Sequence, residues 1–214
     1  MSTYWSTNQI NATTMARLGP YIDGFVGTDG EYQDLYAAVN TGGWKRIIVT
    51  PGCTMSANLT LSANDGFIWS FDMYWAVAIN SSTRRITISG DRWHFVGVRL
   101  DTPSGGDGIT VTGSSFLMER SSVVSGSARG ILLSGGNDHV ITNDCRIMNN
   151  SGDGIEISSG VDRCRIYGNR ISGNGAWGID DNSGIVIEGC NYLLGNTSGA
   201  RSTSSTYVDG KSAT

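Results

Sequence analysis

The sequence of 214 residues predicts an all-β solenoid, in which each repeat of the chain forms one turn of a coil. Four short runs that begin with Gly-Ile carry this prediction, at residues 108–111, 130–133, 154–157 and 178–181. Their starts are separated by 22, 24 and 24 residues. Short β-branched runs at such a period are typical of solenoids, because one repeat cannot bury its apolar face alone.

The composition supports many short strands joined by tight corners. Glycine accounts for 30 of the 214 residues, and charged residues for only 16%. Glycine accepts positive φ at corners, while Ser, Thr and Asn form turns by bonding to their own backbone. The composition is therefore not that of a helical protein.

Two further strands fit into each coil. Another apolar residue stands eight positions before each later Gly-Ile isoleucine, which gives the pairs Val123 with Ile131, Ile147 with Ile155, and Ile171 with Ile179. A third strand fits at Val140-Ile141, Cys164–Ile166 and Ile185–Ile187. Three short strands in about 24 residues describe a parallel β-helix, and the chain has room for roughly seven coils.

An asparagine recurs at one corner of the later coils. Asn150, Asn174 and Asn196 each stand three residues after an apolar anchor. Stacked asparagines can bond to one another and to the turn backbone, as amide ladders do. The coil before them has Gly126 in that place, so we expect the ladder to begin midway along the solenoid.

The chain divides into four segments. Residues 1–26 are polar with a few aromatics and read as an N-terminal arm, residues 27–45 as a capping helix, residues 46–200 as the β-helix, and residues 201–214 as a polar tail. Before the clean repeats, strands are expected at residues 46–52, Leu59–Leu61, Phe67–Trp69, Ala76–Ile79, Ile86–Ile88 and Phe95–Val98.

The capping helix has recognisable ends and one apolar face. Thr28 or Asp29 can cap its start, and its apolar face consists of Leu35, Ala38 and Val39. Such a helix would cover the first coil, which otherwise exposes core side chains and strand edges.

One stretch of sequence carries a family resemblance. It consists of Asp29-Gly30, the helix Leu35–Val39, Gly42-Gly43, and the run from Arg46 to Thr54, which reads Arg-Ile-Ile-Val-Thr-Pro-Gly-Cys-Thr. This order resembles pectate-lyase-like right-handed parallel β-helix proteins, in particular bacteriophage tailspikes and related virion proteins. The resemblance covers residues 24–196. It implies a homotrimer of β-helices that binds or cleaves glycan, and it is specific for fold rather than function.

Charge and hydropathy exclude several kinds of partner. A net charge of −4 and a pI near 5.0 argue against nucleic acid, which needs a basic surface. The longest apolar run, residues 74–79, is too short for membrane insertion, and the N-terminus lacks the pattern of a signal peptide. The four cysteines form no metal or disulfide pattern, so we expect buried free thiols made in a reducing cytoplasm, and no cofactor or metal.

Candidate catalytic residues lie on the Gly-Ile strands. Alternation points Thr110, Leu132, Glu156 and Asp180 outward, and parallel strands lie about 4.8 Å apart, so Glu156 and Asp180 are expected as neighbours. Two close carboxylates push their pKa values apart and can serve as acid and as base or nucleophile. The alternative is two solvated acids on a polar face, which are common.

Asp181 is a third candidate with an unusual position. Strict alternation points it inward, where other coils have apolar residues, and a buried unpaired carboxylate is costly. Either the strand ends or bulges there, or Asp181 has a partner. A loosened last coil is the preferred explanation.

Candidate glycan-binding residues stand directly before the Gly-Ile strands, where the register gives Asp107, Arg129, Asp153 and Trp177. The first three form a ladder of alternating charge, whose expected role is structural. Alternatively, Arg129, Asp153 and Trp177 line a shallow sugar groove with the carboxylates, and Trp177 acts as a stacking platform. A second aromatic group is expected to pack early coils or subunits together rather than bind sugar: Phe67, Trp69, Phe71, Tyr74, Trp75, Trp93 and Phe95.

These features favour a virion structural protein assembled in the host cytoplasm. We expect a trimeric spike, fibre or surface decoration that contacts other virion proteins through the arm or the tail and binds host-surface polysaccharide. The alternative is a small tailspike depolymerase, a glycoside hydrolase or polysaccharide lyase, with Glu156, Asp180 and Asp181 at its site. Against catalysis, the sequence lacks the hydrolase motifs, the calcium cluster and the lyase base known in this fold, and whether the chain is an enzyme stays open. A third possibility is a free carbohydrate-binding β-helix.

Overall fold

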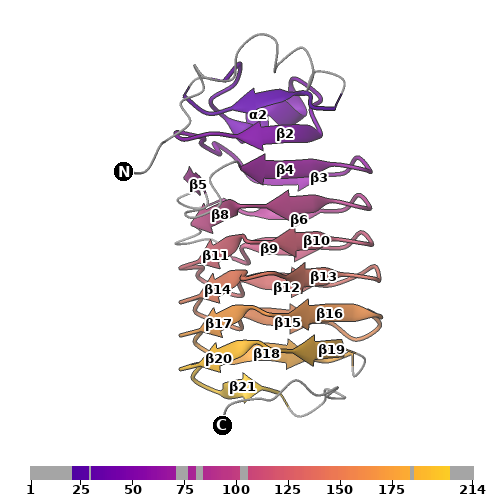
Figure 1. Cartoon of the computed structure of the whole chain (residues 1–214), viewed down its shortest axis with the longest axis vertical. Helices are drawn as coiled ribbons and strands as arrows, with labels where there is room; N and C mark the ends of the chain where they lie inside the picture. Colours follow the sequence, from indigo (N-terminus) through magenta and orange to yellow (C-terminus); the bar gives the residue numbers. More distant parts are fainter. Residues whose placement is uncertain are drawn as a thin grey trace.

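The chain folds into a parallel β-helix, as the repeat predicts (Figure 1). The computed structural model describes residues 21–28, 30–70, 77–80, 84–101, 106–183 and 186–202. Three parallel sheets run along the stack, and the chain passes from sheet A to sheet B to sheet C in each complete coil. The strands of the described part make up seven coils, the first of which has described strands only in sheets A and C.

The strands are short in every sheet. Sheet A contains β1 (Gly24–Val26), β2 (Arg46–Val49), β4 (Phe67–Ser70), β7 (His94–Val96), β10 (Leu117–Glu119), β13 (Val140–Thr142), β16 (Cys164–Tyr167) and β19 (Val186–Gly189). Sheet B contains β5 (Val77–Asn80), β8 (Val98–Asp101), β11 (Ser122–Val124), β14 (Arg146–Met148), β17 (Arg170–Ser172) and β20 (Tyr192–Leu194). Sheet C contains β3 (Leu59–Leu61), β6 (Ile86–Ile88), β9 (Ile109–Val111), β12 (Ile131–Leu133), β15 (Ile155–Ile157), β18 (Trp177–Asp181) and β21 (Gly199–Arg201).

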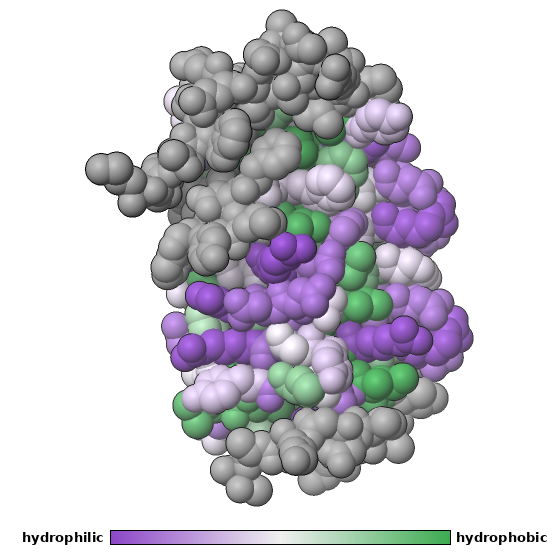
Figure 2. All heavy atoms as spheres, in the orientation of Figure 1, coloured by the Kyte–Doolittle hydropathy of each residue, from purple (hydrophilic) through white to green (hydrophobic). Residues whose placement is uncertain are grey.

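The core consists of apolar rows that run along the solenoid axis. In sheet C, each coil points two residues inward, such as Ile131 and Leu133, and both are fully buried. Sheets A and B each supply one further inward row, to which Ile141 and Ile147 belong. Burial of each such side chain contributes about 1.5–3 kcal/mol, so the stacked rows are the main source of stability. Outside, hydrophobic side chains on the visible face form small groups separated by hydrophilic ones (Figure 2).

Each coil turns its corners through residues with left-handed backbone. Between sheets A and B the described positive-φ residues are Gly97, Arg120, Asn143, Asp144, Gly168 and Cys190. Between sheets B and C they are Gly106, Ser125, Asn149, Gly173 and Gly195, and between sheets C and A they are Asp65, Arg92, Ser115, Gly136, Asp138, Gly160 and Arg163. Left-handed residues bend the chain sharply, and such corners recur along the stack.

Buried asparagines form the predicted ladder between sheets B and C. The side chain of Asn174 is fully buried, and its Oδ1 accepts from the backbone N–H (3.1 Å) and the Nδ2 (3.0 Å) of Asn150. Its Nδ2 donates to the carbonyl of Ile147 (3.2 Å) and to Oδ1 of Asn196 (2.9 Å). The ladder begins at Gly126, whose N–H donates to Oδ1 of Asn150 at 2.9 Å. This start confirms the prediction from sequence.

The same ladder explains the glycine of the Gly-Ile repeat. A Cβ at Gly154 would lie 2.5 Å from Cγ2 of Ile171 and 2.7 Å from Nδ2 of Asn174, and Gly130 meets the equivalent atoms one coil earlier. Neither glycine has positive φ. Close packing, rather than backbone freedom, therefore requires glycine at these positions.

The N-terminal end differs from the prediction in two ways. Residues 24–26, assigned to the arm, form strand β1 and pair in parallel with β2. The helix α2 (Leu35–Asn40) is shorter than expected, and Asp34 rather than Thr28 or Asp29 caps it by accepting from the N–H of Tyr36 at 2.7 Å. Leu35 and Ala38 are buried on the expected apolar face. This helix is not long enough to span a membrane, and the described residues contain no other candidate span.

Other element boundaries also differ from the prediction. The expected strand Phe95–Val98 is two strands, because Gly97 forms a corner with φ of 66° between β7 and β8. Arg201, assigned to the tail, lies in β21. Three of the cysteines are buried free thiols, but Cys190 is exposed and its Sγ donates to the hydroxyl of Tyr167 at 3.0 Å. Residues 1–20 of the arm, residues 203–214 of the tail, and Asp29, Phe71, Tyr74, Trp75, Ala76 and Ile185 lie outside the described residues.

The apolar core ends in charged residues at the C-terminal end of the stack. Glu188 occupies the row of Ile166, and Arg201 occupies the row of Ile179. The Glu188 carboxylate is 2% exposed and lies 2.6 Å from Nε of Arg201. Burial raises the pKa of Glu188, and the positive charge of Arg201 opposes that shift. Inward charges at this level make the stacking of an apolar coil on them unfavourable.

The ladder yields a stability prediction. Asn174→Ala should destabilise the fold by about 2–4 kcal/mol, because it leaves the buried polar groups of Asn150 and Ile147 without partners. Asn64→Ala is a matched control, since Asn64 is exposed although its Oδ1 also accepts a backbone N–H, from Asp91. Urea unfolding of both variants measures the difference, and equal losses would contradict a special role for the buried ladder.

Candidate functional site

Glu156 and Asp180 lie side by side on the outer face of sheet C. The two residues are direct partners in the pairing of β15 with β18, as the alternation predicts. Thr110 and Leu132 continue the same outward row toward the N-terminal end. Both carboxylates are partly buried, so they are less solvated than ordinary surface acids.

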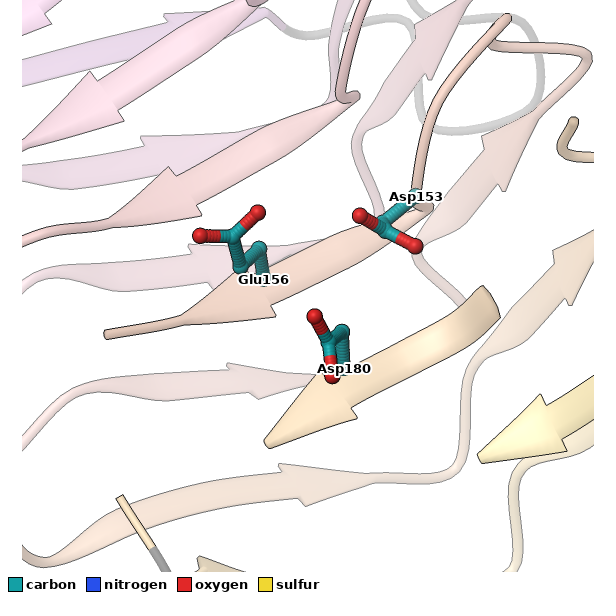
Figure 3. A group of neighbouring side chains, drawn as sticks. All are labelled: Asp153, Glu156 and Asp180. Carbon is teal, nitrogen blue, oxygen red and sulfur yellow. The ribbon is translucent and has the colours of Figure 1, made fainter. Parts of the chain in front are cut away.

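Asp153 joins this pair from the turn before β15. One carboxylate oxygen from each of Asp153, Glu156 and Asp180 lies within 4.8 Å of the other two, and the three groups surround one small space (Figure 3). Oδ1 of Asp153 accepts from the N–H of Trp177 at 2.7 Å, which holds the carboxylate beside the next coil. We refer to these three residues as the acid cluster.

Arg129 connects the acid cluster to the preceding coil. Its Nη1 lies 3.0 Å from Oε2 of Glu156, and its Nε lies 3.0 Å from Oδ1 of Asp107. The expected charge ladder is therefore present between Asp107 and Arg129, but Arg129 hydrogen-bonds to Glu156 rather than to Asp153. Four carboxylates around one guanidinium leave this part of the face negatively charged.

The ring of Trp177 lies toward the following coil. A Cβ on Gly199 would be only 2.8 Å from Cζ3 of the indole, so the ring packs directly on the backbone of Gly199. Trp177 is half-buried, and its link to the acid cluster is its backbone N–H. All the predicted glycan-binding residues are thus near one another in the stack, but only Arg129 and Asp153 present charged groups beside the carboxylate pair.

Two members of the acid cluster have shifted pKa values. Burial is the main cause that raises the pKa of Asp153, and the negative charge of Asp180 adds to it. Burial also raises the pKa of Glu156, where the positive charge of Arg129 opposes the shift and the charges of Asp153, Asp180 and Asp107 reinforce it. Asp153 and Glu156 therefore hold protons more tightly than isolated carboxyl groups do.

Asp181 is not part of the acid cluster. It follows Asp180 on β18 but points into the solenoid and is 1% exposed. Its Oδ1 accepts from the N–H (2.9 Å) and the hydroxyl (2.7 Å) of Ser183, and its own N–H donates to Ser202. Asp181 has the partner that the sequence offered as the second explanation, and it is also the last residue of β18, where the first explanation placed the end of the strand.

The acid cluster is also the place where a cation could be held. Among the described residues, these three side chains are the acidic, His or Cys groups whose ligand atoms lie close enough together to hold one ion. Calcium prefers six to eight oxygen ligands. Glu156 already accepts from Arg129, so a cation would compete with a guanidinium for that carboxylate.

Two residues near the acid cluster carried no signal in the sequence. Asn182 donates from Nδ2 to Oδ2 of Asp180 at 3.1 Å, and Gly199 makes room for Trp177.

In the aromatic segment, Trp93 and Phe95 are buried in the core, as the packing explanation predicts, while Phe67 and Trp69 stack with ring centroids 4.5 Å apart on sheet A.

The raised pKa values predict a pH dependence of stability. A carboxyl with a raised folded-state pKa binds more protons in the folded than in the unfolded protein, so stability falls as pH rises from about 4 through that pKa. Asp180→Asn removes a charge that raises both pKa values, so the variant should gain thermal stability over wild type at pH 7 and gain less at pH 4.

Melting temperatures at the two pH values test this prediction. Glu31→Gln serves as the control, because Glu31 is an exposed acid that precedes α2 at the other end of the stack. A lower melting temperature of Asp180→Asn at pH 7 would show that the carboxylates attract a bound cation rather than repel one another.

Comparison with known proteins supports the architecture. A family model described as a right-handed β-helix region matches residues 75–211. Searches of curated proteins and of solved structures gave no match. The matched segment covers more than half of the chain and includes the acid cluster and the asparagine ladder. The chain therefore belongs to the right-handed β-helix family.

Proposed function

We propose that this β-helix binds glycan through the outer face of sheet C, around the acid cluster and Arg129. The observation that carries the proposal is the convergence of three partly buried carboxylates from two coils beside one guanidinium. Such a group is costly to assemble, because like charges repel and partial burial raises the cost. A ligand that donates several hydrogen bonds would offset that cost.

Sugar hydroxyls suit this arrangement. Carboxylates accept hydrogen bonds in pairs, guanidinium groups donate them, and bonds to charged groups are stronger than neutral ones. The acceptors come from successive coils about 4.8 Å apart, so one sugar ligand can contact two coils at once. Trp177 adds an aromatic ring in the same part of the stack.

We further propose that the chain works in a bacteriophage virion as a trimeric spike, fibre or surface decoration. The support is the resemblance of the helix Leu35–Val39 and the run Arg46–Thr54 to the capped first coil of tailspike-like proteins. In this proposal two further copies of the chain complete the trimer, other virion proteins contact the arm or the tail, and host-surface polysaccharide is the ligand. Assembly takes place in the host cytoplasm.

Glycan hydrolysis is the second candidate function. The raised pKa of Glu156 suits a general acid, and Asp180 beside it suits a nucleophile. Carboxyl groups about 5 Å apart are typical of retaining hydrolases, and the oxygens of this pair approach within 4.8 Å. Asp181 has no part in this mechanism, since its side chain is inside the solenoid.

One set of measurements separates binding from hydrolysis. Wild-type protein should bind members of a panel of bacterial surface polysaccharides, and Glu156→Gln should weaken that binding about tenfold or more, because charge-assisted hydrogen bonds are lost. Asp144→Asn is the control, because Asp144 is an exposed acid at the corner between β13 and β14. Release of reducing ends by wild type and not by Glu156→Gln would favour the hydrolase. Failure to bind any polysaccharide would refute both candidates.

The virion proposal has its own test. Sedimentation should give a particle of three times the monomer mass of 22.8 kDa, and purified virions should contain a fixed number of copies. A monomer that is absent from virions would contradict this proposal without affecting the glycan-binding one.

A further inference from the structure

A hollow lies on the outer face of sheet A, away from the acid cluster. Its volume is about 390 Å³, and its walls come from three successive coils. The lining residues are Asp138, Val140, Arg163, Arg165 and Ile187. Val140, Arg165 and Ile187 are register partners on β13, β16 and β19, so the floor of the hollow is a cationic side chain between two apolar ones.

One of the two arginines is already neutralised. Arg163 forms a bidentate pair with Asp138, with Nε to Oδ1 at 2.7 Å and Nη2 to Oδ2 at 2.9 Å, and its Nη1 lies 2.9 Å from Oδ2 of Asp162. The hydrogen bonds from Arg163, together with the charges of Arg163 and Arg165, lower the pKa of Asp138. Both oxygens of Asp138 are therefore turned toward Arg163.

Arg165 has a different environment. Within the described part of the chain, no hydrogen bond or ion pair joins its guanidinium to another residue, although its backbone N–H donates to the carbonyl of His139. Its partners in register, Val140 and Ile187, carry no charge. The guanidinium offers five N–H donors in a planar fork that fits the two oxygens of a carboxylate.

The apolar part of the lining limits which ligands fit the hollow. Ile187 is 46% exposed, so its aliphatic side chain is available to a ligand in the hollow. Two residues after Arg165 on the same face of β16, about 6.6 Å along the strand, Tyr167 is 49% exposed, and its ring packs on Gly189. A ligand in the hollow meets the guanidinium of Arg165 between two aliphatic side chains, beside the ion pair of Arg163 with Asp138, and the ring of Tyr167 lies farther along β16. A small hydrated anion would use only the first of these.

We propose that this hollow binds an acidic sugar residue, with its carboxylate on Arg165 and the C–H face of its ring against Val140 and Ile187. A sugar ring has an apolar face of C–H groups, and a carboxylate on that ring pairs with a guanidinium in bidentate geometry. A following residue of the same chain would stack on Tyr167. The site is on another sheet from the acid cluster and does not depend on the proposed function of that cluster.

Methyl and amide NMR titrations of the full chain test the site with three probes: sodium glucuronate, glucose and sodium sulfate. Glucuronate should shift the methyl signals of Val140 and Ile187 in a saturable way, whereas glucose and sulfate should bind at least tenfold more weakly. If sulfate bound as tightly as glucuronate, the hollow would be a general anion site, and the proposed sugar ligand would be wrong. Equal binding of glucose would overturn the role of Arg165, and unshifted methyl signals with glucuronate would overturn the proposal entirely.

Three variants assign the contacts. Arg165→Gln should weaken glucuronate binding about tenfold, because it removes the charge that pairs with the carboxylate. Arg170→Gln is the matched control, since it removes another exposed arginine, on β17 of sheet B, and should leave binding unchanged. Asp138→Asn should tighten binding, because it removes the negative charge in the lining. Unchanged affinity in both Arg165→Gln and Asp138→Asn would refute the assignment, whatever glucuronate does at the acid cluster.

Discussion

The buried asparagines between sheets B and C hold successive coils in register. Each amide satisfies backbone groups of the coil before it, and a buried backbone group without a partner would cost about 1–3 kcal/mol. A shift of one residue would leave these groups unpaired and would also turn the apolar rows outward. The ladder therefore specifies one alignment of the coils, while the apolar rows supply most of the stabilisation.

The ladder also imposes glycine at the start of each later strand of sheet C. The side chains of Asn174 and Ile171 fill the space that a Cβ of Gly154 would need. Since this glycine directly precedes β15, it fixes where the strand begins and hence which side chains face outward. The pairing of Glu156 with Asp180 follows from that register. A packing constraint at a corner thus places the chemistry on the neighbouring sheet.

The two proposed ligand sites use the same scaffold in different ways. The acid cluster and the hollow each combine side chains from successive coils, so neither exists within one repeat of the chain. Their charges are opposite, because acids gather around Arg129 on sheet C while Arg165 lies between aliphatic side chains on sheet A. Hydroxyl groups therefore suit the acid cluster, whereas a carboxylate suits the hollow.

The last described coil places two charged side chains in the core. Glu188 and Arg201 stand in rows that are otherwise apolar, and each compensates the charge of the other. Another apolar coil could not pack on this level without burying both charges more deeply.

The sequence by itself determined the parallel β-helix, the start of the ladder at Gly126 and the pairing of Glu156 with Asp180. These features depend on spacing and alternation, which are periodic and local. Only the tertiary structure decided that Asp153 joins the pair as the sugar-groove alternative has it, that Asp34 caps the helix, and that Ser183 is the partner of Asp181. It also revealed the hollow around Arg165. These features depend on where turns direct side chains between coils, and the local sequence pattern does not specify those directions.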